Sequence, residues 1–304
     1  MFKYSLDNKR YHTLNYFYRN KFGSKITKVS LNANFSCPNF KNGNGCIFCS
    51  HGSGNTGYEN KTLLEQYNEV KKIMDNKWPN SKYIGYFQAN SNTYAPLNEL
   101  KEKYELILKQ PDVVGLAIAT RPDAISNECL NYLEELNKRT FLTIELGLQS
   151  MHETTLNFIN RGHSLQQFED MVNELKKRNI FVVAHIINGL PYETKEMMLD
   201  TVKYLNKLGI DGIKIHMLHI VKNTPLADIY EKEKFHVLTK EEYIDIVCDE
   251  LELLNPTIVV ERITGDPIKE ELVTPTWLLK KFCVLNDIDK EMLKRNSYQG
   301  IKNI

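Results

Sequence analysis

Short apolar stretches alternate with amphipathic stretches along most of this chain. Six apolar stretches have the length and β-branched content of strands: residues 26–31, 83–87, 113–119, 141–147, 180–187 and 212–217. Four amphipathic stretches carry apolar side chains at helical spacing, at residues 61–77, 97–109, 164–178 and 194–208. Ser126 is placed to cap a further helix. Because strands that alternate with helices form right-handed crossovers, the pattern predicts an α/β fold with one parallel sheet.

Polar residues follow or end each predicted strand, and they help to choose between two α/β architectures. They are Cys37 with its neighbours, Gln88, Thr120 and Arg121, Glu145 to Gln149, Asn188, and Lys214 to His216. An open doubly wound sheet places its ligands mainly beside the point where the strand order reverses. In a barrel, by contrast, all the strand ends surround one mouth. We therefore expect a six-stranded partial (β/α)6 barrel of the TIM type over residues 26–221.

The two ends of the chain differ from this central pattern. Residues 222–304 contain helical patterns at 225–232, 239–254 and 276–295 and an extended stretch at 257–263, so we expect an extension that packs on the barrel. Residues 1–25 form a basic and aromatic lead-in. Such a composition can bind RNA through phosphates and unstacked bases. Alternatively, the aromatic rings pack on the core while the lysines stay in solvent, and we favour this second interpretation.

Composition narrows the class of protein only slightly. The chain has 304 residues, 42% of them hydrophobic and 25% charged, which is typical of a soluble globular protein. A net charge of +1 favours no particular partner. No apolar run reaches the roughly 18 residues of a membrane helix, and the first residues do not resemble a signal peptide. We therefore expect a cytoplasmic protein, in which thiols stay reduced and six cysteines indicate metal binding or catalysis rather than disulfides.

Three cysteines lie together in a loop rich in glycine and asparagine after the first predicted strand. Cys37, Cys46 and Cys49 could bind zinc or an iron–sulfur cluster. A structural zinc site needs four ligands, and the nearest fourth candidate is His51. The other cysteines, Cys129, Cys248 and Cys283, stand singly in helical patterns, as buried free thiols do. A set of three thiolates would leave one iron of a cluster open to a ligand, with Phe48 beside it.

The cysteine loop also resembles a known family. Three cysteines after the first strand, the last two as Cys-x-aromatic-Cys, on a barrel of six βα units resemble the radical SAM superfamily. The wide first spacing resembles its elongator-type branch. Further sequence stretches resemble YhcC/YtqA-like radical SAM proteins, including Cys37-Pro-Asn39, Thr120-Arg-Pro-Asp123, Glu145 to Ser150, Asn160-Arg-Gly-His163 and Asn188-Gly-Leu-Pro191.

The resemblance implies two cofactors and a radical reaction. A [4Fe-4S] cluster would be held by Cys37, Cys46 and Cys49, and S-adenosylmethionine would chelate the open iron through its amino and carboxylate groups. An electron donor such as flavodoxin or ferredoxin would supply one electron. Cleavage of the sulfonium would then give methionine and a 5′-deoxyadenosyl radical that abstracts hydrogen from carbon.

Further site residues follow from matching positions. By resemblance, Glu145 would accept hydrogen bonds from the ribose hydroxyls with Gln149 beside it, and Arg161 would pair with the methionine carboxylate. Thr120 and Arg121 would line the pocket, and the turn of Asn188 to Leu190 would pass the adenine. Many superfamily members bind the methionine amino group with a glycine-rich acidic segment after the second strand, whereas Gln88 stands there in this chain. Substrate candidates are Lys214 and His216, which alternate along the sixth strand, and Arg262 of the tail.

The elongator-type resemblance also implies a substrate. Relatives act on the wobble uridine of tRNA, and the implied reaction removes the carboxymethyl part of carboxymethylaminomethyl-uridine to leave aminomethyl-uridine. The lysine-rich tail around Lys290 is compatible with RNA. Two alternatives stay open: the same radical chemistry on a small metabolite or peptide, and a metal-binding module without catalysis.

Overall fold

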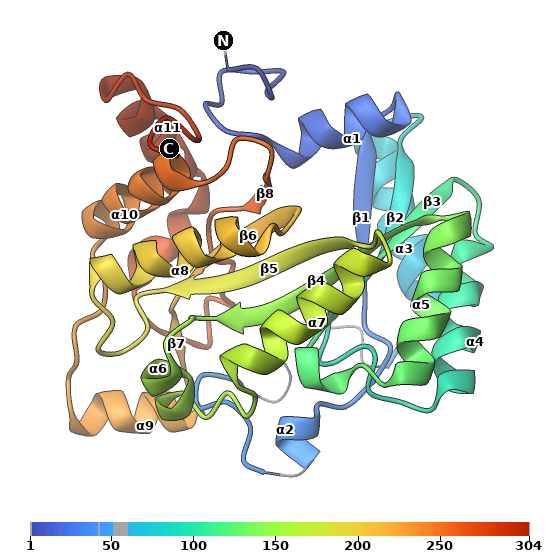
Figure 1. Ribbon diagram of the computed structural model, residues 1–304, viewed down its shortest axis with the longest axis horizontal. Helices are drawn as coiled ribbons and strands as arrows, with labels where there is room; N and C mark the ends of the chain where they lie inside the picture. The colour runs from blue at the N-terminus through green and yellow to red at the C-terminus, as the bar shows by residue number, and fades with distance from the viewer. Residues whose placement is uncertain (1, 42, 51–59, 304) are drawn as a thin grey trace.

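The computed structural model describes residues 2–41, 43–50 and 60–303 of the chain. Seven strands form one parallel sheet that curls into a half-barrel (Figure 1). In the order of the sheet they are β1 (Ile26–Leu31), β2 (Lys82–Phe87), β3 (Val113–Thr120), β4 (Phe141–Gln149), β5 (Phe181–Asn188), β6 (Gly212–Met217) and β8 (Val259–Arg262). The prediction of an α/β partial barrel is therefore confirmed.

The predicted number of strands in this sheet was one too low. Strand β8 comes from the C-terminal extension and pairs in parallel with β6, where Gly212 lies opposite Val259 and Ile213 opposite Val260. The chain reaches β8 only after helices α9 (Pro225–Lys232) and α10 (Lys240–Leu253). The expected extended stretch is thus an edge strand of the half-barrel. The chain divisions at residues 25 and 221 stay a prediction.

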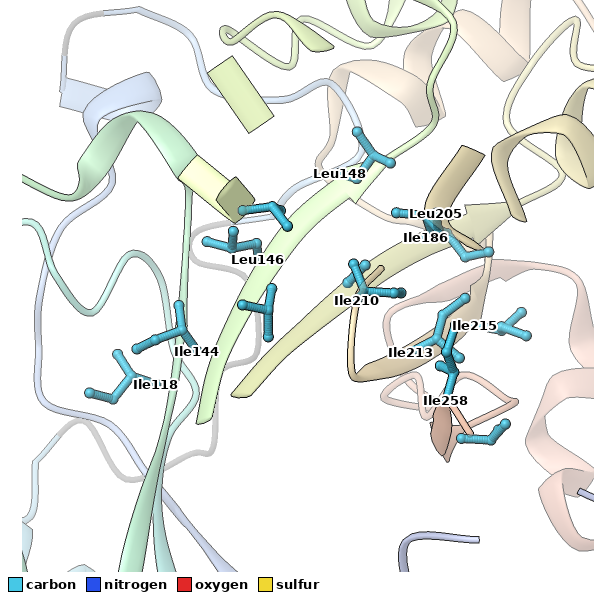
Figure 2. Close-up of a cluster of buried hydrophobic side chains, with 14 of the residues drawn as sticks. Ile118, Ile144, Leu146, Leu148, Ile186, Leu205, Ile210, Ile213, Ile215 and Ile258 are labelled. Atoms are coloured by element: carbon cyan, nitrogen blue, oxygen red, sulfur yellow. The ribbon is translucent and has the colours of Figure 1, made fainter. Parts of the chain in front are cut away.

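The helices between the strands cover the outer face of the sheet. They are α3 (Leu63–Lys77), α4 (Leu97–Leu108), α5 (Asn127–Arg139), α7 (Leu165–Lys177) and α8 (Lys195–Leu208). Because successive residues of a strand face opposite sides, Ile144, Leu146 and Leu148 of β4 belong to the outer core together with Leu205 of α8 (Figure 2). Glu145 of the same strand points into the half-barrel, where it meets lysines from other strands.

Local sequence signals set the ends of these helices. Thr62 and Glu65 form a reciprocal capping box at the start of α3. Ser126 caps α5 as predicted, because its side chain accepts a hydrogen bond from the Cys129 backbone N–H. Gly209 ends α8 with a left-handed φ of 73°, which glycine adopts without steric cost. The predicted helices therefore agree with the structure to within two residues at each end.

Helix α1 (Leu14–Phe22) closes the half-barrel at the N-terminal ends of its strands. Phe17 lies 5.0 Å from the ring of Phe181 at the start of β5, and Phe22 lies 5.5 Å from Phe141 at the start of β4. Tyr18 is buried with these rings. These aromatic side chains of the lead-in are thus packed in the core, as the favoured interpretation expects. They form an apolar floor under the half-barrel.

The lead-in is also tied to the last part of the chain. The Val260 backbone N–H donates to the His12 carbonyl at 2.8 Å, and the Gln299 backbone N–H donates to the Arg10 carbonyl at 2.9 Å. The side-chain oxygen of Gln299 accepts from the His12 backbone N–H at 2.7 Å. The floor of the half-barrel is therefore held in place by residues from both ends of the sequence.

The remaining elements lie around the C-terminal ends of the strands and in the tail. They are α2 (Pro38–Lys41), α6 (Glu153–Phe158), the antiparallel pair β7 (Ile220–Val221) and β9 (Leu272–Thr274), α11 (Lys281–Lys294), and the short 3-10 helices Pro122–Ala124 and Thr276–Lys280. In the tail, Lys281, Lys290, Lys294 and Arg295 each form an ion pair with a carboxylate. Within the described residues, no helix is both long and apolar enough to cross a membrane.

Candidate functional site

The cysteine loop lies at the C-terminal end of β1, at the end of the half-barrel away from α1 (Figure 1). Backbone hydrogen bonds anchor it on both sides: the Ile47 N–H donates to the Ile159 carbonyl at 3.0 Å, and the Leu226 N–H donates to the Ile47 carbonyl at 2.9 Å. The side-chain amide of Asn160 donates to the Gly45 carbonyl at 2.6 Å. Segments after β4 and after β7 therefore hold the loop over the mouth of the half-barrel.

The thiol of Cys46 lies in a positively charged environment. Its Sγ is 3.7 Å from Nη1 of Arg161 and 3.5 Å from the amide nitrogen of Asn39. A hydrogen bond from the Cys49 thiol, aided by the charges of Arg161 and Arg121, outweighs burial and lowers the pKa of Cys46 to about 5. Cys46 is therefore a thiolate at neutral pH, which is the form that binds metals.

The three thiols of the cysteine loop act on one another. Cys49 contacts Cys46 and lies within electrostatic reach of Cys37. Within the described residues, no group of three or more His, Cys, Asp or Glu side chains converges on one metal position. Soft thiolates backed by two arginines suit an iron–sulfur cluster. His51, the predicted fourth candidate, lies outside the described residues.

Arg161 connects the cysteine loop to β4 and keeps one donor free. Its Nη2 donates to the Gly147 carbonyl at 2.6 Å. A Cβ at residue 147 would lie 2.6 Å from Nη2, so any larger residue there would displace the end of the Arg161 side chain. The Nε of Arg161 is buried and has no hydrogen-bond partner among the described residues. Because an unpaired buried donor costs about 1–3 kcal/mol, this guanidinium is suited to an anionic ligand such as a carboxylate.

Thr120 and Arg121 end β3 beside this guanidinium. Arg121 forms a bidentate pair with Asp123, with both contacts at 2.9 Å, and its Nη1 donates to the Arg161 carbonyl at 2.7 Å. The Thr120 hydroxyl is buried and lies 2.6 Å from the hydroxyl of Thr93. Arg121 therefore holds the backbone of Arg161 in place and adds positive charge near Cys46.

A buried ionic network fills the middle of the half-barrel. Lys28 of β1 pairs with Glu145 of β4 at 2.8 Å and with Glu261 of β8 at 2.6 Å, and so connects the two edge strands. Lys214 of β6 and His185 of β5 bind the other oxygen of Glu145. Burial alone would raise the pKa of Glu145, but Lys214 and Lys28 outweigh it and hold the pKa well below its ordinary value of 4.5. Glu145 is therefore ionised.

This network places three of the predicted residues close together. Lys214 and His216 face the interior, as predicted, and the ring of His216 lies 5.2 Å from that of His185. The Nζ of Lys214 also donates to the Tyr86 hydroxyl at 3.1 Å. Both oxygens of Glu145 already accept from cations, so binding of ribose by Glu145 stays a prediction that would use its remaining lone pairs.

Asn188 and Leu190 have surroundings that the sequence did not indicate. The Asn188 amide donates to Glu250 of α10 at 2.8 Å, so this side chain is directed away from the cysteine loop. Leu190 and Phe48 belong to one apolar cluster with Leu226. The Asn188 carbonyl accepts from the Leu218 backbone N–H at 2.8 Å, so passage of the adenine along this turn stays a prediction.

Gln88 follows β2 and Gln149 ends β4, with β3 between these two strands. The side-chain oxygen of Gln88 accepts from the Ser30 hydroxyl of β1 at 3.0 Å. Gln149 has a left-handed φ of 77°, which is uncommon for a residue other than glycine and directs the chain out of β4. The side-chain nitrogen of Gln149 lies close to Gly147, because a Cβ added to that glycine would be only 2.7 Å away from it.

Sequence reasoning gave no site role to Lys28, Glu261, Asn39 or Tyr86. Lys28 and Glu261 are charged residues within short apolar strands, a signal that could have indicated a buried pair. Asn39 donates to the Asn160 carbonyl at 2.7 Å and approaches Cys46, but nothing in its sequence context distinguishes it from the other loop asparagines.

Comparisons with known proteins agree with this geometry. Residues 40–205 match the model of the radical SAM superfamily, and residues 210–294 match the radical SAM C-terminal domain. The chain belongs to the radical SAM superfamily, a family of enzymes whose members bind a [4Fe-4S] cluster and S-adenosylmethionine. Within it, the chain is of the YhcC/YtqA type.

Two of the relatives described here match nearly the whole chain, and a third matches half of it. YtqA of Bacillus subtilis is 48% identical over 98% of this chain and 94% of its own length. YhcC of Escherichia coli K12 is 30% identical over 92% of this chain and 91% of its own length. The tRNA uridine(34) acetyltransferase of Methanocaldococcus infernus is 26% identical over 50% of this chain, which spans 29% of that protein. Among solved structures, archaeal Elp3 from the same organism shares the fold with a TM-score of 0.69 and 18% identity, covering 91% of this chain and 64% of its own.

Proposed function

We propose that this protein modifies the wobble uridine of tRNA, removing the carboxymethyl part of carboxymethylaminomethyl-uridine to leave aminomethyl-uridine. Hydrogen abstraction from the methylene beside the carboxylate and return of one electron to the donor side would give an imine, and its hydrolysis by water would break the C–N bond and release the two-carbon unit as glyoxylate. The observation that carries the chemistry is the cysteine loop, with the Cys46 thiolate beside Arg161, over the mouth of a parallel half-barrel. The substrate is supported by distant similarity to a protein named as a tRNA uridine(34) acetyltransferase. An electron donor such as flavodoxin or ferredoxin is part of the proposal.

The residues have distinct tasks in this proposal. Cys37, Cys46 and Cys49 hold the cluster, and the free Nε of Arg161 binds the methionine carboxylate. When bound, the two cofactors supply a one-electron cleavage that yields a carbon radical able to abstract hydrogen. Glu145, kept ionised by Lys28 and Lys214, accepts hydrogen bonds from the ribose.

The remaining predicted residues complete the pocket. Gln88 and Gln149 lie around the strand ends, Thr120 and Arg121 support Arg161, and Phe48 and Leu190 form the apolar side. The aromatic floor formed by α1 closes the opposite end, so that water and substrate both enter from the side of the cysteine loop. Exclusion of water protects a radical from side reactions.

Mass spectrometry of tRNA nucleosides tests the proposed function. Cells that lack the gene should accumulate carboxymethylaminomethyl-uridine and lose aminomethyl-uridine, and a copy of the gene should restore it. A Cys46→Ala copy should fail to restore it, whereas a Cys283→Ala copy should succeed because this exposed thiol lies in α11. Unchanged nucleosides in the deletion strain would refute the tRNA substrate. 5′-Deoxyadenosine formation by the reconstituted protein would in that case indicate a small metabolite or peptide.

A further inference from the structure

A β-bulge in the last strand of the sheet changes the direction of Arg262. In the pairing of β6 with β8, Ile213 lies opposite Val260 but Lys214 lies opposite Arg262, so Glu261 is the extra residue. A bulge sets two successive residues opposite one partner, and near a functional site it can redirect a side chain. In regular alternation Glu261 and Arg262 would face opposite sides of the sheet. Here the Glu261 side chain is only 1% exposed inside the half-barrel, whereas Arg262 is exposed.

The charge of Arg262 acts on the interior of the half-barrel. Burial, followed by His185 and then Arg262, lowers the pKa of His216 well below its ordinary value. Arg262 also acts on the buried Tyr86 hydroxyl, although burial dominates there and raises its pKa. Register partners on neighbouring strands face the same side of a sheet, and Arg262 lies opposite Lys214, whose side chain faces the interior. The bulge thus turns Arg262 toward the interior face, the side on which His216 lies two residues further along β6.

Arg262 carries a positive charge without a counter-ion. The two lysines and two glutamates of the buried network, Lys28, Lys214, Glu145 and Glu261, cancel one another. Among the described residues, no carboxylate lies within 4.0 Å of the Arg262 guanidinium. Elsewhere at the site, Arg121 is paired with Asp123 and Arg161 lies beside the Cys46 thiol. Among the described residues of this network, the charge of Arg262 is therefore left to pair with one monovalent anion.

We propose that Arg262, with His216 beside it, binds the carboxylate of the substrate side chain and so distinguishes substrate from product. This inference rests on the proposed function, in which the substrate uridine bears one carboxylate and the product bears none. The planar guanidinium fork matches a carboxylate in two parallel hydrogen bonds. Substrate and product both carry an amine that is cationic when protonated, so loss of the carboxylate leaves the product with only the repulsion from this guanidinium. Arg262 thus favours both binding of the substrate and release of the product.

The test compares two forms of one tRNA. The tRNA with carboxymethylaminomethyl-uridine is taken from cells that lack the gene, and part of it is converted to the aminomethyl form by the wild-type enzyme. Binding of both forms is measured anaerobically with reconstituted wild type, Arg262→Gln, Arg262→Lys and the control Arg19→Gln. Arg19 is likewise exposed and is not ion-paired to any described residue, but it lies on α1 at the closed end. The KM for S-adenosylmethionine and conversion rates are measured on the same preparations.

The expected result is a loss of discrimination. Wild type and Arg19→Gln should bind the carboxylated tRNA roughly 10- to 100-fold more tightly than the product, which is the range for a charge-assisted hydrogen-bonded pair. Arg262→Gln should bind both forms alike, Arg262→Lys should keep part of the preference, and the KM for S-adenosylmethionine should be unchanged. Conversion by Arg262→Gln should fall by a similar factor.

Three results would overturn the assignment. The first is an unchanged preference in Arg262→Gln. The second is equal weakening of both tRNA forms, which indicates a phosphate contact. The third is a raised KM for S-adenosylmethionine with the preference intact, which indicates the methionine carboxylate. Failure of the proposed function looks different, because the wild-type enzyme itself would then convert no tRNA, and the assignment would fall with it.

Discussion

Lys28→Met should severely destabilise the fold, because it removes the cation that joins the two edge strands of the half-barrel. Lys28 contacts Glu145 at 2.8 Å and Glu261 at 2.6 Å, and these two side chains are 0% and 1% exposed. Methionine keeps most of the length and apolar volume of lysine but not its charge. Glu145 would keep Lys214 and His185, whereas Glu261 would keep, among the described residues, only the cation of Lys214, at 3.7 Å.

The expected cost follows from the uncompensated carboxylate. Removal of one partner from a buried ion pair typically costs about 3–5 kcal/mol, and the lysine side chain is only 14% exposed, so solvent screens it little. Whole domains have a free energy of unfolding of about 5–15 kcal/mol. With an m-value of about 3 kcal/mol per molar urea, the midpoint of unfolding should therefore fall by roughly 1–1.7 M.

Urea unfolding of the cofactor-free protein, followed by circular dichroism, measures this cost. The control is Lys138→Met, which removes an i,i+4 pair with Glu134 whose side chains are 71% and 36% exposed. An exposed helical pair contributes about 0.3–0.5 kcal/mol, so this midpoint should hardly move. The double variant Lys28→Met/Glu261→Gln should recover part of the loss, because the uncompensated charge is gone.

Two results would contradict this reasoning. If Lys28→Met costs no more than Lys138→Met, the buried network contributes little to stability. If the double variant is no more stable than Lys28→Met, the loss comes from packing around residue 28 rather than from the carboxylate of Glu261.

Two further predictions concern residues behind the site. Gly147→Ala would place a Cβ 2.6 Å from Nη2 of Arg161 and 2.7 Å from Nε2 of Gln149. Both atoms are ends of flexible side chains that can move aside, so the Tm should change little. The displaced Arg161 should lower 5′-deoxyadenosine formation, measured by chromatography, by about tenfold or more. Unchanged formation would refute the role of Arg161. Burial raises the pKa of Glu250 to about 8 from an ordinary 4.5. The folded protein thus binds a proton that the unfolded chain releases, and stability from this group is lost as the pH rises from 4.5 to 8. Glu250→Gln should therefore gain stability over wild type across this range, by about 1–3 kcal/mol at pH 8 in urea titrations; a parallel loss of stability with pH in both proteins would contradict it.

The helices and the first six strands of the sheet could be predicted because each of them has a signal in its own few residues. The apolar run of β4 and the capping residue Ser126 act over a few residues, and both are found where predicted. The place of β8 has no such local signal. Its pairing with β6 joins segments separated by two helices, and the extended pattern of residues 257–263 fits an edge strand and a loop equally well. Tertiary pairing, not propensity, decides between them.

In the candidate site, too, residues with a local sequence signal could be predicted, and residues brought together by the fold could not. The three cysteines and Arg161 could be identified because their spacing and neighbouring residues resemble a family, and the structure brings Cys46 and Arg161 within 3.7 Å. Asn188 matched the same resemblance, but its side chain is bound to Glu250, since α10 packs behind β5. The ion pair of Lys28 and Glu261 could not be predicted from the sequence, because it forms when the sheet curls and brings its two edge strands together.

The ties between the lead-in and the tail also set an order of assembly during synthesis. Residues 10–12 bond to residues 257–299, so these ties under the floor cannot form until almost the whole chain has left the ribosome. At about 5–20 residues per second, this delay is on the order of tens of seconds. Before that, α1 can pack on the starts of β4 and β5 through Phe141 and Phe181, but without its ties to the tail. A stop codon shortly before residue 257 would release a chain whose six earlier strands of the sheet are complete and whose floor lacks these ties.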